Sequence, residues 1–310
     1  MARKKITVIG GGRVGEHTVH NLAMKQLGDI VMVDIVEGKP QGIALDIMEE
    51  RPLSGWDVNI LGTNDYADIA GSDVIVMTAG FPRKPGMSRD DLIEANMNVI
   101  KPAAENFKKY APNAIVIVVT NPLDVICWTA AEVTGFAKNK VMGMAGVLDA
   151  NRFKAFVAME MGVSVKDVQA YVLGGHGDNM VPLVRHSNIG GIPLSEIMPK
   201  DKLDFVVERT RKAGGEIVKN LGYSAYFSPG HSAADMVQAI LLDEKRVLPA
   251  AAYLQGEYGL NDLFLGVPVL LGSEGVEKVF ELKLTDDEQA ALMKSADGVK
   301  NVVEVAKKFL

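Results

Sequence analysis

Short apolar runs alternate with longer amphipathic stretches over the first 145 residues of the chain. The short runs are rich in β-branched residues and apolar at successive positions, which is typical of strands buried on both faces of a parallel sheet. The longer stretches, 14–27 and 92–110 among them, have the spacing of helices that cross between such strands. This alternation predicts a doubly wound parallel sheet of the α/β class, with strands at 5–10, 29–34, 58–63, 73–80, 114–120 and 141–146.

The pattern changes beyond about residue 165. Residues 171–184 predict antiparallel strands, and residues 202–220 predict a helix. Residues 246–269 predict a set of short strands separated by Gly and Pro turns. The segment TDDE at 285–288 is a capping-box pattern, and the apolar stripe that follows it predicts a last helix whose role is packing.

The length of 310 residues is comfortable for two domains, and the change of pattern divides the chain into residues 1–145 and 146–310. The second is expected to be a C-terminal α+β substrate domain packed tightly on the first. A net charge of −6 and a pI near 5.5 give no sign of the basic footprint of a nucleic-acid-binding protein. No run approaches the roughly 20 apolar residues of a membrane span, and the first apolar stretch is too short for a signal peptide. We expect a cytoplasmic protein whose partners include neither nucleic acid nor membrane.

The single cysteine, Cys127, excludes an intramolecular disulfide framework and a multi-cysteine metal cluster. Its use fits a reducing compartment, and we interpret it as a small apolar residue of the core. No metal site is predicted.

A glycine-rich segment, GGGRVG, fits the pattern GxGxxG directly after the first predicted strand. Glycine makes up 31 of 310 residues, so roughly 0.3 matches arise by chance and the context must decide. Here the segment joins a strand to a helix, where the first glycine turns the chain, the second admits a pyrophosphate and the third packs helix on strand. The free amides of the helix N-terminus then face the phosphates. The candidate cofactor residues of this turn are Gly10, Gly11, Gly12, Arg13, Val14 and Gly15.

Asp34 ends the second predicted strand, 19 residues after Gly15. An acid at this place holds both hydroxyls of an adenosine ribose and repels a 2′-phosphate, so NAD is favoured over NADP. The alternative is a glycine-rich turn that binds nothing.

Polar residues follow two further strands at the edge where parallel sheets bind ligands. The loop FPRKPGMSRDDL at 81–92 carries the cations Arg83, Lys84 and Arg89, and it is either a lid or a solvated basic turn. Asn121 ends another strand and precedes Pro122, so it is either a ligand-binding amide or part of a plain turn.

Three residues of the second half complete the candidate chemistry. Asp149 and Arg152 are one helical turn apart, which places them on one face as site residues or as a surface ion pair. His176 lies in GGHGDN, and its glycine neighbours suit an imidazole exposed to a ligand better than one packed in a core.

The motifs GGGRVG, TAGFPRKPGMSRDDL, VVTNPLDV, GVLDANRF and GGHGDNMVPL, together with Asp34, occur in the order and with the spacing of the lactate/malate dehydrogenase family. The chain closely resembles that family over essentially its whole length, and in particular its lactate-dehydrogenase-like bacterial malate dehydrogenases. The resemblance implies a Rossmann domain, NAD as cofactor, and the reversible oxidation of (S)-malate to oxaloacetate. It also implies a homo-oligomer, for which we favour a homotetramer over a homodimer.

The resemblance gives each matching residue a role. His176 is implied as the proton acceptor and Asp149 as its buried carboxylate partner. Arg152 is implied to hold the substrate's C1 carboxylate, and Asn121 to lie beside the nicotinamide and the substrate oxygen. The lid residues Arg89 and Arg83 are implied to polarise the reacting oxygen and to distinguish substrates, respectively. The remaining cofactor positions that the resemblance implies are Asn96, Val119 and Thr120.

The chemistry needs these residue types. Oxidation of a 2-hydroxy acid requires a base with a pKa near neutrality, and the pKa of a free histidine side chain is about 6.5. A carboxylate such as Asp149 fixes the imidazole tautomer, and the planar fork of Arg152 grips a carboxylate bidentately. Burying an unpaired Arg83 over lactate would cost several kcal/mol, so a dicarboxylate substrate is expected.

Three other functions share features with this one. A different 2-hydroxy acid dehydrogenase, such as a lactate dehydrogenase, differs only in the substrate. An NAD-dependent glycosidase would need a metal held by Cys and His, and an NAD-binding redox sensor would need no base. His231, in SPGHSAADM, is unexpected where relatives place small pocket residues, and we interpret it as a surface or interface residue.

Overall fold

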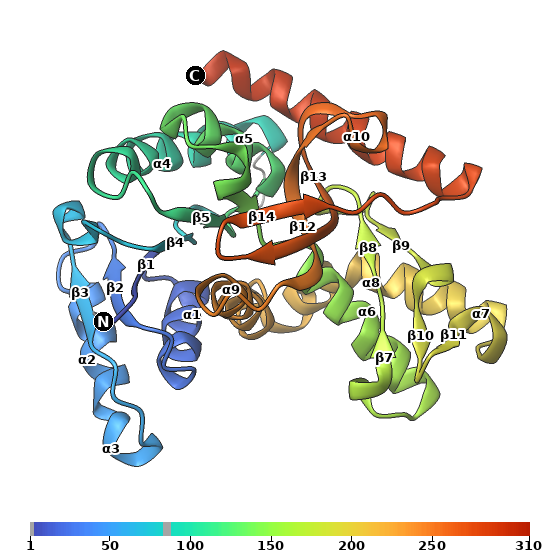
Figure 1. Cartoon of the computed structure of the whole chain (residues 1–310), viewed down its shortest axis with the longest axis horizontal. Helices are drawn as coiled ribbons and strands as arrows, with labels where there is room; N and C mark the ends of the chain where they lie inside the picture. Colours follow the sequence, from blue (N-terminus) through green and yellow to red (C-terminus); the bar gives the residue numbers. More distant parts are fainter. Residues whose placement is uncertain (1–2, 83–87) are drawn as a thin grey trace.

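The computed structural model describes residues 3–82 and 88–310, and a mixed sheet of nine strands runs through these residues (Figure 1). Six of its strands are parallel: β1 (Lys5–Ile9), β2 (Asp29–Val33), β3 (Ile60–Thr63), β4 (Val74–Met77), β5 (Ile115–Val118) and β6 (Val141–Gly143). Their order across the sheet, β6-β5-β4-β1-β2-β3, is that of a doubly wound dinucleotide-binding fold. The predicted parallel strands and their class are therefore confirmed.

Helices cover both faces of this sheet. In Figure 1, α4 (Arg89–Tyr110) and α5 (Leu123–Thr134) lie above it, and α1 (Arg13–Met24) and α2 (Lys39–Glu49) lie below. The short α3 (Arg51–Ser54) follows α2. A capping box of Ser88 and Asp91 starts α4, because each side chain accepts the other's main-chain N–H.

The second half extends the same sheet with three antiparallel strands, β12 (Arg246–Gln255), β13 (Asn261–Gly272) and β14 (Gly275–Val279). Strand β12 joins the parallel part through Ala251, which lies opposite Gly143 of β6. The predicted set of short strands is wrong, because Pro249 and Pro268 do not mark turns. They face each other inside two long strands, and the carbonyl oxygen of Pro268 accepts the main-chain N–H of Phe280 at 2.9 Å, on the side of β13 away from β12.

The rest of the second half of the chain consists of helices and two small antiparallel sheets. Helices α6 (Gly146–Met161), α7 (Leu194–Ile197), α8 (Lys200–Leu221) and α9 (Phe227–Leu241) precede β12, and α10 (Asp286–Ala306) closes the chain. Two small antiparallel sheets consist of β7 (Val168–Gln169), β8 (Val172–Leu173), β9 (Val181–Pro182), β10 (Asn188–Ile189) and β11 (Ile192–Pro193). The predicted antiparallel pair, the helix near 202–220 and the C-terminal capping box are confirmed.

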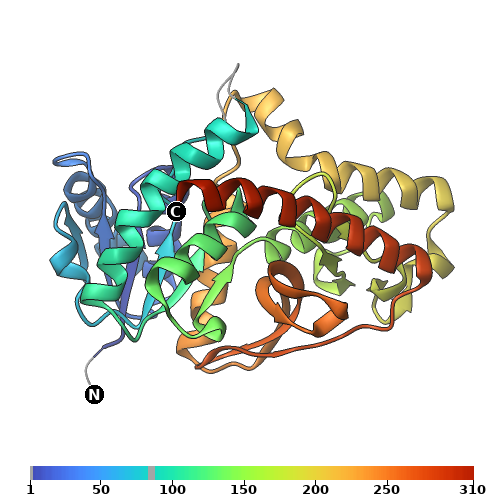
Figure 2. The ribbon, with the colours of Figure 1, turned by 90° about the horizontal axis from the view of Figure 1, so that it is seen from above.

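The two halves share one apolar core. Buried residues of β1 to β6 are continuous with those of β12, β13 and α10, and a smaller core lies around α6 and α8. Figure 2 shows α10 lying across the same side of the sheet as α4 and α5. Cys127 of α5 is fully buried in this core, as expected. Within residues 3–82 and 88–310, no helix combines the length and apolar character that crossing a membrane requires.

Candidate active site

The turn between β1 and α1 requires its glycines for different reasons. Gly10 has a φ of +107°, and a Cβ there would lie 2.6 Å from the main-chain nitrogen of Ala79. A Cβ on Gly15 would lie 1.8 Å from the carbonyl oxygen of Gly10. A Cβ on Gly12 would meet no heavy atom within 4 Å among the described residues beyond its chain neighbours, so space for a ligand opens there. The turn thus has the geometry predicted for a phosphate-binding loop, with the N-terminus of α1 behind it.

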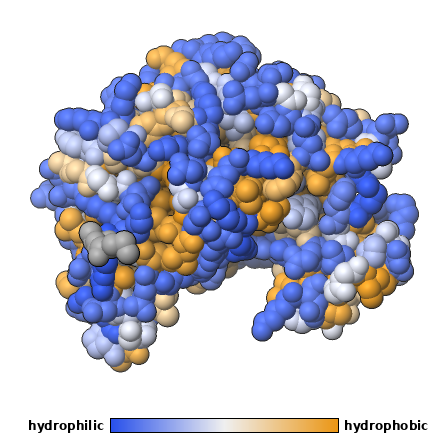
Figure 3. Space-filling view, viewed as in Figure 1, coloured by the Kyte–Doolittle hydropathy of each residue, from blue (hydrophilic) through white to orange (hydrophobic). Residues whose placement is uncertain are grey.

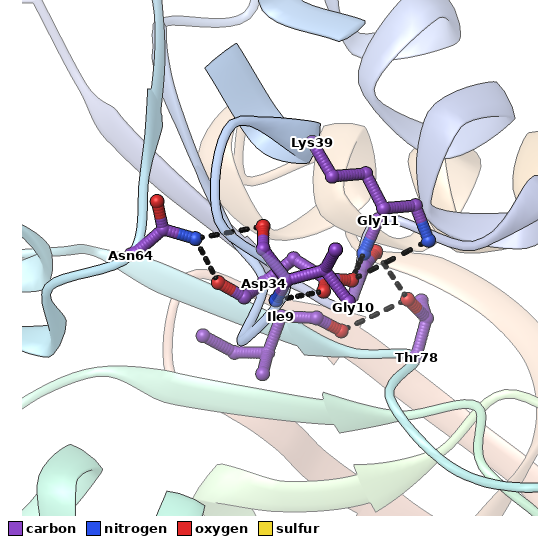
Figure 4. Close-up of polar contacts among 8 residues, drawn as sticks. Ile9, Gly10, Gly11, Asp34, Lys39, Asn64 and Thr78 are labelled. Carbon is purple, nitrogen blue, oxygen red and sulfur yellow. Dashed lines mark hydrogen bonds and ion pairs between the residues drawn. The ribbon is translucent and has the colours of Figure 1, made fainter. Parts of the chain in front are cut away.

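Asp34 lies at the end of β2, beside this turn (Figure 4). Its Oδ2 accepts the main-chain N–H of Gly11 at 2.6 Å, and its Oδ1 accepts that of Val36 at 2.9 Å. Lys39 Nζ lies 3.8 Å from Oδ2. Asn64 Nδ2 donates to the carbonyl oxygens of Asp34 and Val36, at 2.7 and 2.9 Å, so it fixes the loop. Each carboxylate oxygen keeps a lone pair for a ribose hydroxyl.

A cavity of about 1130 Å³ extends from the turn along the carboxyl ends of the strands. One wall includes Gly12 and Thr120, and the other is the end of α8 with the loop that follows it. Arg13 stacks its guanidinium 3.5 Å from the ring centre of Tyr223 in that loop, and Tyr226 lies next in line at 6.0 Å. No sequence motif marks these two tyrosines, so neither was predicted to line the site. Val14, Val119 and Asn121 also line the cavity.

Two residues predicted for the chemistry form a close pair. His176, in the loop between β8 and β9, places Nδ1 2.8 Å from Oδ2 of Asp149 in the first turn of α6. A carboxylate only accepts, so Nδ1 carries the proton and Nε2 is free to take another. Arg152 Nη1 donates to Oδ1 of the same carboxylate at 3.3 Å. The alternative of a surface ion pair is wrong, because the side chains of Arg152 and Asp149 are only 13% and 3% exposed.

Burial and charge act in opposite directions on these groups. Burial alone would lower the pKa of His176, but attraction and hydrogen bonding to Asp149 outweigh it, so the pKa of His176 is raised. Burial lowers the pKa of Arg152, and Asp149 partly offsets this. Among the described residues, Nε of Arg152 is buried and has no hydrogen-bond partner. A buried N–H in this state fits an anionic ligand that supplies the acceptor.

Asn121 lies where two cavities meet. It lines the large cavity and also a second one of about 410 Å³ beside His176. Its carbonyl oxygen accepts Nδ2 of Asn96 at 2.6 Å. Asn96 is fully buried and also bonds both main-chain polar groups of Phe81, at 2.7 and 3.1 Å. Both N–H groups of the Asn96 amide are therefore spent on the main chain, so Asn96 can serve a cofactor only by holding these segments or through its oxygen.

The predicted lid is described only at its ends. Arg83 lies outside the described residues, as does Lys84. The main chain of Arg89 begins α4, while its side chain is not among the described ones. His231 is exposed in the first turns of α9, as expected of a surface residue.

Cys127 gives no support to the glycosidase alternative. Burial raises the pKa of its thiol, which points into the core toward Gly143. Among the residues that the structure describes, no three His, Cys, Asp or Glu side chains gather as metal ligands would.

Comparison with known proteins places these features in context. Residues 4–143 match the model of the lactate/malate dehydrogenase NAD binding domain, and residues 146–310 match that of the lactate/malate dehydrogenase alpha/beta C-terminal domain. The malate dehydrogenase of Geobacillus thermodenitrificans (strain NG80-2) is 57% identical over 308 residues, which are 98% of this chain and 99% of that one. That of Thermomicrobium roseum is 53% identical, with 99% of both chains covered.

Solved structures agree. The apo malate dehydrogenase from Picrophilus torridus superposes with a TM-score of 0.97 at 46% identity, covering 99% of this chain and 98% of that one. The lactate dehydrogenase from Cryptosporidium parvum, complexed with lactic acid and β-nicotinamide adenine dinucleotide, gives 0.96 at 42% identity, with 99% of each chain covered.

Proposed function

The chain belongs to the lactate/malate dehydrogenase family, and we infer that it catalyses the reversible, NAD-dependent oxidation of (S)-malate to oxaloacetate. The observation that carries this inference is the pairing of His176 with Asp149 beside a buried arginine with an unpartnered N–H. Malate, as opposed to lactate, is supported by the malate dehydrogenases of Geobacillus thermodenitrificans and Thermomicrobium roseum, which are 57% and 53% identical to this chain.

The proton of the substrate hydroxyl passes to His176. Because Nδ1 donates to Asp149, the free Nε2 is the atom that accepts this proton. Asp149 holds the imidazole in that tautomer and stabilises the imidazolium that forms. Bound NAD supplies the hydride acceptor at nicotinamide C4. In the reverse direction the imidazolium returns its proton to the oxygen of oxaloacetate.

Arg152 is proposed to hold the C1 carboxylate of the substrate. One guanidinium nitrogen is engaged with Asp149, and the buried Nε–H remains for the carboxylate. Two parallel N–H···O bonds fix the substrate's orientation as well as its charge. Asn121, which lines both cavities, is proposed to lie between substrate oxygen and nicotinamide.

The residues of the turn are proposed to hold the cofactor's phosphates, and Asp34 its adenosine ribose. Their fit rests on the open space at Gly12 and on the lone pairs that Asp34 retains beside it. The full set of proposed cofactor residues is Gly10, Gly11, Gly12, Arg13, Val14, Gly15, Asp34, Asn96, Val119, Thr120 and Asn121.

Arg83 and Arg89 are proposed to complete the site from the lid. Arg89 polarises the reacting oxygen, and Arg83 pairs with the second carboxylate of malate. Closing an unpaired Arg83 over pyruvate would leave a desolvated charge, at a cost of several kcal/mol. The enzyme is therefore expected to prefer oxaloacetate strongly over pyruvate.

Following NADH absorbance with oxaloacetate, pyruvate and a phosphoglycoside tests the proposal. Rapid consumption of NADH with oxaloacetate alone is expected, and Arg83→Gln should lower kcat/KM for oxaloacetate by orders of magnitude while sparing pyruvate. A preference for pyruvate would favour the lactate dehydrogenase alternative. No absorbance change with either 2-oxo acid would refute a dehydrogenase.

We further propose that the chain is a homo-oligomer, a homotetramer in preference to a homodimer. Figure 3 shows apolar surface in the middle of the face formed by α1 and α9. Exposed apolar side chains of these helices include Met24 and Phe227, which are 47% and 63% exposed. Light scattering after size exclusion measures the state directly. Residues 1–145 and 146–310 are proposed as the cofactor and substrate domains, and the lone buried cysteine supports a cytoplasmic location.

A further inference from the structure

Asp124 is a buried carboxyl group beside the site with no role in the reaction described above. It is the second residue of α5, and its residue surface is 7% exposed. Its Oδ2 accepts the main-chain N–H of His176 at 3.2 Å. Its Oδ1 is buried and has no hydrogen-bond partner within the parts of the chain that the structure describes. A buried polar atom in this state calls for an explanation.

The loop that carries His176 is held at two successive amides. Ser295 of α10 accepts the N–H of Gly175 at 2.9 Å, and Asp124 accepts the next one. A Cβ on Gly175 would lie 3.2 Å from Oδ2 of Asp124, so this glycine lets the loop approach the carboxyl group closely. These two hydrogen bonds orient the main chain of His176, whereas Asp149 orients its ring.

Charged groups reach Asp124 from two directions. The imidazole of His176 attracts it, and Asp149 of α6 repels it. On its own helix, burial and the charge of Asp124 both raise the pKa of the Cys127 thiol, and α10 contributes the uncharged Ser295. Burial raises the pKa of Asp124 to about 6, and the attraction of His176 opposes this rise.

Resting on the proposed function, we propose that Asp124 is a positioning residue of the reaction, which fixes the main chain of His176 and places a second negative charge beside its imidazolium. The proton taken from the substrate stays on His176, and Asp124 stabilises it there through space. Both carboxylates favour the charged imidazole, and Arg152 opposes them. Asp124 thereby helps set the pH range in which His176 accepts a proton from malate.

Asp124→Asn tests this proposal, because the amide keeps an oxygen acceptor for the His176 N–H and removes the charge. The acidic limb of kcat/KM for malate oxidation reports deprotonation of His176, and it should move to lower pH by about 0.5–1 unit. The basic limb of oxaloacetate reduction, which needs the imidazolium, should move in the same direction by the same amount. Deuterated malate keeps the measurement on the chemical step. A purely structural role would lower both rates without moving either limb.

Asp204→Asn is the matched control, because it removes an equal charge from an exposed position of α8 that lines neither cavity. Its limbs are expected at the wild-type positions, since water screens an exposed charge. Asp124→Ser is the second variant if Asp124→Asn does not fold, with the same displacement expected. Limbs of the folded Asp124 variant that coincide with those of the wild type would overturn the inference. A wild type without malate turnover would instead refute the proposed function, and this inference with it.

Discussion

Removing the fork of Arg152 should impair substrate binding far more than cofactor binding. One of the five guanidinium N–H groups is bonded to Asp149 and the buried Nε–H is unpartnered, so two of the remaining N–H groups can form a bidentate contact with a substrate carboxylate. Each hydrogen bond to a charged group contributes about 1.5–3 kcal/mol. Arg152→Met removes two of them, about 3–6 kcal/mol, so kcat/KM for oxaloacetate should fall by about 10²- to 10⁴-fold. Arg152→Lys keeps the charge but only one bond, so its loss should be about 10- to 150-fold.

The sign of the pH effect is a second test of the same substitution. Arg152 opposes the charged form of His176, so its removal raises the pKa of the imidazole further. In Arg152→Met the acidic limb of malate oxidation should therefore move to higher pH, whereas in Arg152→Lys it should stay near the wild-type position.

The assay is steady-state NADH consumption, with the Kd of NADH measured by fluorescence. Arg209→Lys is the control, because Arg209 pairs with Glu216 on the exposed side of α8. This substitution is expected to leave kcat/KM unchanged. An Arg152→Met enzyme within tenfold of the wild type, or one whose losses lie in NADH binding, would refute the carboxylate role.

Four other substitutions test the cofactor half of the site. Asp34→Ser should lower the NADH-to-NADPH ratio of kcat/KM by about 10- to 100-fold, because it removes the charge that repels a 2′-phosphate; an unchanged ratio would contradict the ribose assignment. Gly15→Ala places its Cβ 1.8 Å from the Gly10 carbonyl oxygen, so the free energy of unfolding, measured by thermal unfolding, should fall by about 1–3 kcal/mol. Gly12→Ala should keep the wild-type stability, because its Cβ meets no heavy atom within 4 Å among the described residues beyond its chain neighbours, and it should weaken NAD binding as measured by calorimetry. Asn96→Ala removes the side chain that joins the main chains of Phe81 and Asn121, and it leaves their buried polar groups unpaired. The free energy of unfolding, measured by chemical denaturation, should therefore fall by about 1–3 kcal/mol, and kcat should fall as well. An unchanged free energy of unfolding would argue against this role of Asn96.

Local sequence patterns predicted much of the fold. Runs buried on both faces predicted the parallel strands, and the spacing of turn and helix signals located the phosphate turn. Pro249 and Pro268 predicted turns that the fold does not have, because a proline's effect depends on the partner strand, which the sequence does not reveal. The sheet's continuity through Ala251 and Gly143 likewise depends on pairing between distant segments.

Some residues of the site could likewise be predicted from local patterns, and others could not. His176 and Asp149 stood out because glycines surround one and a helical turn joins the other to Arg152. The contact between Asp124 and His176 spans 52 residues, and that between Ser295 and Gly175 spans 120. Neither follows from local spacing, because the tertiary fold alone brings these pairs together. Asp124 lies in the motif TNPLD, but nothing in the sequence indicates its contact with His176.

The most direct test of the account is the single-turnover rate of NADH formation from (S)-malate in the wild type and in His176→Asn. The account predicts that the wild type forms NADH with a primary deuterium isotope effect, while His176→Asn binds NAD with unchanged affinity and forms NADH at least about 10²-fold more slowly. Hydride transfer at the wild-type rate without the imidazole would contradict the central claim that His176, held by Asp149, is the base of the reaction.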